Sequence, residues 1–77
     1  MLIMEKKLAE IFSNIFKVEE NKITDVVSPD NLENWDSLSH MDLVVSIEEE
    51  FSVRFSSDEI IEMKNFKMVK GLLASKI

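Results

Sequence analysis

The chain has 77 residues, a formal net charge of −6 from 15 acidic and 9 basic side chains, no Cys and one His. The missing Cys and single His exclude disulfides, thiolate metal sites and a His-rich metal site, and the negative charge disfavours nucleic acid and anionic lipid as partners. A chain this short is expected to fold as a single domain, residues 1–77, that buries only ~60% of its unfolded surface.

The first predicted element is an amphipathic helix at about residues 3–17. Its apolar side chains recur at i, i+3, i+4, i+7 and i+8, which is the spacing of one helix face. These side chains are Leu8, Ile11, Phe12, Ile15 and Phe16. The apolar start of the chain ends at Glu5, too early for a signal peptide, and no apolar run reaches membrane-spanning length. We therefore expect a cytoplasmic protein without membrane insertion.

Residues 18–36 are predicted to form a long connection, because turn-forming Asn, Asp, Ser and Pro are frequent there. A loop of this length is unusual in a compact domain, so we expect apolar side chains to hold it against the core. The candidates are Ile23, Val26, Val27 and Leu32. We expect the loop to cross between two roughly antiparallel helices, with Trp35 as a further anchor against the second one.

The second predicted helix begins at Asp36 or Ser37 and ends near Ser52. Its apolar residues again follow helical periodicity. The carboxylate of Asp36 is expected to accept hydrogen bonds from the free N–H groups of the first turn. This helix therefore has a defined start directly after the long loop.

Two further helices are predicted. Ser56 and Glu59 have the spacing of a capping box, which opens a short helix at about residues 57–63. Apolar spacing from Phe66 predicts a last helix at about residues 66–76, and no segment alternates like a strand. The predicted fold class is all-α: a small bundle of three main helices and one short helix, with a long first loop.

Ser37 is the candidate functional residue, although taken alone it would be interpreted as a plain helix cap. The unpaired N–H groups and the dipole of a helix N-terminus favour an anion by ~0.3–1 kcal/mol. The preceding loop leaves the hydroxyl exposed, and residues 36–59 carry seven acidic side chains against one basic. His40, expected at the surface, has no orienting partner in the sequence, so a Ser–His hydrolase is disfavoured.

The segment around Ser37 resembles the second helix of acyl carrier proteins. The resemblance rests on Asp36-Ser37-Leu38, followed at fixed spacing by Leu43-Val44 and by Ile47-Glu48-Glu49-Glu50-Phe51. The first triplet alone would be a weak signal, and the combination is a strong one. The remaining predicted helices extend the resemblance over essentially the whole chain.

The resemblance implies a carrier and not an enzyme. A phosphopantetheinyl transferase would move a 4′-phosphopantetheine arm from coenzyme A to Ser37, and the arm's thiol would carry acyl groups as thioesters. Biosynthetic enzymes with basic patches would dock on positions that match the family's docking residues: Asp36, Leu38, Asp42, Glu48 and Glu49. Positions that match the family's acyl-chain pocket are Val44, Ile47, Phe55, Ile60, Met63 and Val69.

Several residues depart from the pattern of carriers in fatty acid synthesis. Ser39-His40 replaces a stretch that is often acidic, and Ser56-Ser57 stands where Pro-Asp is common. With the bulky pocket residues, these departures favour a specialised, stand-alone carrier of small or short acyl groups. We also expect the protein to be a monomer. Its pathway would be lipid, polyketide or related secondary biosynthesis. The Trp-Asp-Ser-Leu run is also similar to D-alanyl carriers, and an unmodified acidic module that binds through residues 42–50 remains an alternative.

Overall fold

Four α-helices and one turn of 3₁₀ helix make up the regular structure of residues 3–77, the part of the chain that the computed structural model describes. The elements are α1 (Ile3–Phe16), η1 (Glu20–Lys22), α2 (Ser37–Phe51), α3 (Ser57–Glu62) and α4 (Phe66–Ala74). Each predicted helix agrees with an observed one to within two residues at either end, which confirms the all-α fold class. The first two residues of the predicted domain lie outside the described range.

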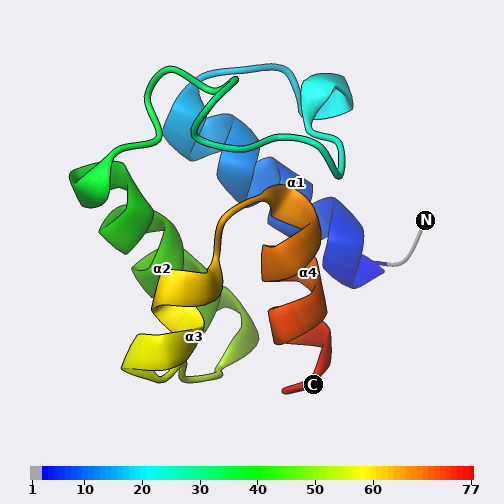
Figure 1. The fold of residues 1–77 in the computed structure, drawn as a ribbon. Helices are drawn as coiled ribbons and strands as arrows, with labels where there is room; N and C mark the ends of the chain where they lie inside the picture. The colour runs from blue at the N-terminus through cyan, green and yellow to red at the C-terminus, as the bar shows by residue number, and fades with distance from the viewer. Residues whose placement is uncertain (1–2) are drawn as a thin grey trace.

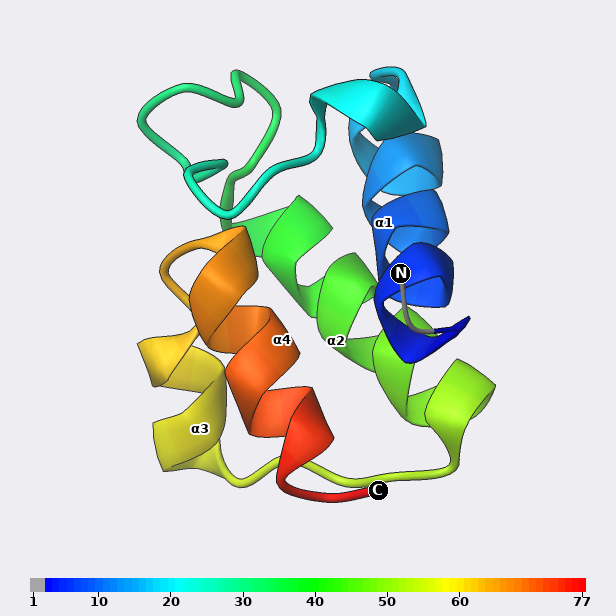
Figure 2. The same ribbon diagram turned by 90° about the vertical axis from the view of Figure 1, so that its right-hand side faces the viewer.

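The helices α1, α2 and α4 surround the core, and the long loop covers one end of it (Figure 1). As predicted, α1 and α2 run in opposite directions, α1 towards the loop and α2 away from it (Figure 2). Burying one large apolar side chain contributes roughly 1.5–3 kcal/mol to folding. These three helices bury nine large apolar side chains. They are Leu8, Phe12, Phe16, Leu43, Val44, Ile47, Phe66, Val69 and Leu73.

Capping, and not burial, defines the short helix α3. None of its own residues is buried. At its start the Ser56 hydroxyl accepts a hydrogen bond from the Glu59 N–H, and the Glu59 carboxylate accepts one from the Ser56 N–H, as predicted. Because these bonds satisfy N–H groups that a helix start would otherwise leave unpaired, they allow a helix of only six residues to form.

Three of the four predicted anchors hold the long loop, and the fourth prediction is wrong. Ile23, Val27 and Leu32 are buried, whereas Val26 is 74% exposed. On this turn Val27 faces the core and its neighbour Val26 does not. The Val26 carbonyl instead accepts a hydrogen bond from Asn31, which stabilises the turn itself.

The loop is also joined to the last helix. The N–H of Phe66, the first residue of α4, donates to the carbonyl of Val27 at 2.9 Å. The loop that leads to Ser37 is therefore fixed to α4 through its backbone as well as through its side chains. Within residues 3–77 no helix has the length and apolar character needed to cross a bilayer.

Candidate functional site

Ser37 is the first residue of α2, and Asp36 provides the cap. The Asp36 carboxylate accepts from the Ser39 N–H at 3.0 Å, and the Ser39 hydroxyl accepts from the Asp36 N–H at 2.9 Å. This reciprocal pair is a capping box, so the interpretation of Ser37 as a plain cap is wrong. The Ser37 side chain is exposed and is not needed to start the helix.

The electrostatics at the start of α2 suit an anion despite the neighbouring carboxylate. The Ser39 N–H, and next the Ser39 hydroxyl, hold the pKa of Asp36 below its usual value. The negative charge of Asp36 thus lies next to the backbone N–H groups of the first turn, where the positive end of the helix dipole stabilises it. Ser37 is the first residue of this 15-residue helix, so a phosphate on its side chain would lie near the remaining free N–H groups of the first turn.

Trp35 fixes the chain immediately before Ser37. Its side chain is only 6% exposed, and its ring lies 5.4 Å from that of Phe12 and 5.3 Å from that of Phe16. Aromatic pairs at such separations contribute about 0.5–1.5 kcal/mol beyond their burial. This confirms the prediction that Trp35 is an anchor. The partners include α1 as well as α2, so the site is held from both helices.

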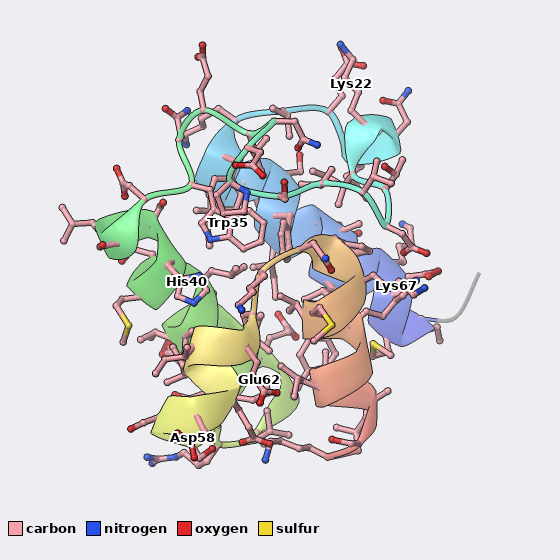
Figure 3. The ribbon with its side chains drawn as sticks, in the orientation of Figure 1. Lys22, Trp35, His40, Asp58, Glu62 and Lys67 are labelled. Atoms are coloured by element: carbon pink, nitrogen blue, oxygen red, sulfur yellow. The ribbon has the colours of Figure 1, made fainter. Side chains whose placement is uncertain are left out.

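His40 joins three parts of the chain, and it is less exposed than the sequence predicted. The side chain is half-buried between Trp35 and α3 (Figure 3). Its Nδ1 accepts a hydrogen bond from the Trp35 indole N–H at 2.8 Å, and its Nε2 lies 2.9 Å from the carbonyl oxygen of Ile60. The neutral tautomer with its proton on Nε2 satisfies both contacts. Both ring nitrogens are therefore occupied, and neither is free to act as a base for Ser37.

No pattern in the sequence predicts this contact network. Trp35 and His40 are five residues apart, a spacing that predicts no contact because the two lie on either side of a helix start. The carbonyl of Ile60 is 20 residues from His40, and any residue supplies a carbonyl. Only the packing of α3 beside α2 brings the two together.

A shallow hollow of about 500 Å³ lies directly beside Ser37. It is bounded by the long loop, by the start of α2 and by the segment between α3 and α4. Trp35 and Met63, both buried, face it from below, whereas the charged residues lie at its rim. The complete lining is Pro29, Asp30, Trp35, Asp36, Ser37, His40, Met63 and Lys64.

The predicted docking residues occupy different environments. Leu38 is 81% exposed, and Asp42 and Glu49 are exposed further along α2. Glu48 is half-buried, and its carboxylate accepts a hydrogen bond from the Phe55 N–H at 2.9 Å. Glu48 therefore stabilises the connection that follows α2, a role that its charge did not reveal in the sequence.

The predicted acyl-pocket residues gather in one place, which is the core itself. Val44, Ile47, Phe55, Met63 and Val69 are all buried members of the core. Ile60 is half-buried and packs against them. These side chains fill the space between α2, α3 and α4, so an acyl chain would have to separate them to enter.

The site fits the attachment of a phosphodiester-linked arm. Ser37 offers an exposed hydroxyl, the start of α2 favours a phosphate, and the hollow has room for a flexible chain. A nucleophilic mechanism lacks support, because the only nearby His is engaged elsewhere.

Comparisons with known proteins agree with this geometry. Residues 6–73 match a family model described as a phosphopantetheine attachment site. The acyl carrier protein of Coprothermobacter proteolyticus is 33% identical, with 94% of this chain and 88% of that protein covered. Among solved structures, the holo acyl carrier protein of Geobacter metallireducens superposes with a TM-score of 0.85 at 31% identity, covering 97% of this chain and 86% of that one. The acyl carrier protein of Enterococcus faecalis gives 0.79 at 27% identity, covering 96% and 94%.

Proposed function

The chain belongs to the acyl carrier protein family, whose prosthetic group is a covalent 4′-phosphopantetheine arm, and we propose that Ser37 is the residue that carries it. Members of the family are carriers and not enzymes, and they interact with phosphopantetheinyl transferases and biosynthetic enzymes. The observation that supports Ser37 is its position: an exposed hydroxyl at the start of a long capped helix, beside a hollow.

The attachment step needs only the Ser37 hydroxyl from this chain. Its oxygen forms a bond to the phosphorus of the arm, and the bond from that phosphorus to adenosine 3′,5′-bisphosphate breaks. The hydroxyl proton passes to the transferase, because both nitrogens of His40 are occupied. When bound, the arm supplies the thiol that a chain without Cys lacks.

For the pathway, we propose a specialised carrier in lipid, polyketide or related secondary biosynthesis. The support is the set of departures around Ser37, among them Ser39-His40, together with the bulky residues at the acyl-pocket positions. The D-alanyl carriers, which share the Trp-Asp-Ser-Leu run, are the second candidate class. The cytoplasm is the proposed location, because coenzyme A donates the arm there.

The attachment is tested by incubating the protein with coenzyme A and a broad-specificity phosphopantetheinyl transferase. Intact mass spectrometry should show the gain of one phosphopantetheinyl group in the wild type and no gain in Ser37→Ala. Ser57→Ala is a matched control, because Ser57 is also exposed and is the first residue of a capped helix. That variant should gain the arm like the wild type.

Two results would contradict the proposal: a wild type that gains no mass, or a Ser37→Ala variant that still does. A wild type that gains no mass would favour the alternative of an unmodified acidic module, whereas a gain in Ser37→Ala would assign the arm to another residue. Such a module would bind its partner through residues 42–50, and the binding would be unaffected by Ser37→Ala.

A further inference from the structure

We propose that the hydrogen-bonded bridge from Trp35 through His40 to Ile60 closes the floor of the hollow beside Ser37, so that the arm and its cargo stay at the surface. The inference rests on the proposed attachment of the arm at Ser37. It adds a specificity-determining role for His40: the exclusion of longer acyl chains from the core.

The bridge spans the gap through which a chain tethered at Ser37 would reach the core. His40 is on α2 one turn after Ser37, and its ring extends to the carbonyl of Ile60 near the end of α3. The indole N–H of Trp35 donates to the other ring nitrogen of His40, Nδ1. The two rings are nearly parallel, with their centroids 6.0 Å apart. The two rings lie next to each other between the loop and α3 (Figure 3). Both line the hollow, and the hydrogen bond between them joins them into one surface.

Below this surface the core leaves no room without movement. Met63 lines the hollow and is 2% exposed, and Val69, which belongs to the same core, is completely buried. To admit an acyl chain, the protein would have to break the His40 contact with Ile60 and separate α2 from α3. That opening would leave the indole N–H and the Ile60 carbonyl without the hydrogen bonds that His40 makes with them, which opposes it.

The bridge also predicts which substitution should open the floor. His40→Ala removes the ring and both hydrogen bonds. His40→Gln retains an acceptor for Trp35 and a donor for Ile60, with a similar separation between the two atoms. The pair of variants therefore tests whether the two hydrogen bonds, and not the imidazole ring itself, close the floor.

The test compares acetyl and octanoyl forms of the same protein, loaded onto Ser37 from the matching acyl-coenzyme A by a broad-specificity transferase. In the wild type, the methyl signals of Met63 and Val69 should be the same in both forms. In His40→Ala, the octanoyl form alone should shift them. Comparing two cargoes within one variant cancels any change that the substitution itself causes in the fold.

A second measurement is the reaction of the thioester with hydroxylamine. In the wild type the two cargoes should react at similar rates. In His40→Ala the octanoyl thioester should react about tenfold more slowly than the acetyl thioester. Burial of two methylene groups would be enough to give this protection. His40→Gln should behave like the wild type in both measurements.

Three results would overturn the inference: core shifts with octanoyl in the wild type, no octanoyl-dependent shift in His40→Ala, or a His40→Gln variant that behaves like His40→Ala. If His40→Ala folds poorly, the double variant Trp35→Phe with His40→Ala tests the same prediction without leaving an unpaired indole N–H. Failure of the transferase to load Ser37 is detected earlier, by mass. That failure would overturn the proposed function and this inference with it.

Discussion

Two adjacent residues at the start of α2, Asp36 and Ser37, have different roles. Asp36 starts the helix through its bond to the Ser39 N–H, and Ser37 stays available for chemistry. This division was only half predictable. Asp before a helical pattern is a known signal for a cap, and Asp36 was expected to cap this helix, but the sequence left open whether the helix begins at Asp36 or at Ser37. The reciprocal bond from Asp36 N–H to Ser39 decides between them.

Asp36 also gives a prediction for the effect of acid on stability. The pKa of Asp36 is lower in the folded protein than its ordinary value of 3.8. The ionised carboxylate therefore stabilises the fold at pH values above 3.8, and this contribution is lost as the pH falls towards the pKa in the folded protein. Glu59 behaves in the same way below 4.5, because the Ser56 N–H and then Lys76 lower its pKa. The protein should therefore lose stability as the pH falls below about 4.5.

Asp36→Asn tests the contribution of this one carboxylate. The Asn amide oxygen still accepts from the Ser39 N–H but does not titrate, so the loss of stability between neutral pH and about pH 3.5 should be smaller than in the wild type. Urea unfolding at the two pH values measures it. An unchanged loss would show that the lowered pKa of Asp36 has no part in acid sensitivity.

At the scale of elements, the helices were predictable and the contacts around Ser37 were not. Apolar spacing and capping residues determine where each helix lies, and those signals are local in the sequence. The capping role of Asn65 at α4, by contrast, was not predicted, although Asn is a common cap. The inward side of a loop is not periodic, which is why Val26 was assigned to the core wrongly.

The backbone at the end of α2 is strained at one residue, Ser52. Ser52 closes the helix in the left-handed region, with φ 54° and ψ 47°, where residues other than Gly are disfavoured. Ser52→Gly should therefore raise the free energy of unfolding by about 0.5–1 kcal/mol, measured by urea denaturation.

Ser75→Gly is the matched control for this prediction. Ser75 also closes a helix, but its φ is −73°, an ordinary right-handed value that gives Gly no advantage. The control should be unchanged or slightly less stable. Equal effects at the two positions would contradict the account of strain at Ser52.

At the scale of the whole molecule, the charge is unevenly distributed along the chain. Residues 36–59 have a large acidic excess, whereas residues 60–77 have one acidic and four basic side chains. The acidic excess belongs chiefly to α2, the helix that begins at Ser37. A basic partner would therefore be steered towards the face from which the arm is presented, an effect that weakens as salt is added.

Glu49→Lys tests this steering. Glu49 is exposed on α2, so its reversal should lower kcat/KM of the transferase for this protein by roughly two- to tenfold, chiefly through KM, while leaving the unfolding temperature nearly unchanged. Glu20→Lys in η1 makes the same change of charge away from the site. Equal losses in the two variants would indicate an effect of net charge alone and would contradict docking on α2.

The central claim, that Ser37 is the attachment site, is tested most directly by locating the added mass within the modified wild-type chain. The segment between Lys22 and Arg54 contains several serines, among them Ser39 in the capping box, so fragment ions must separate them. The arm's mass should appear in fragments that include Ser37 and should be absent from fragments that begin at Leu38. Added mass on Ser39 or on any other serine would contradict the account.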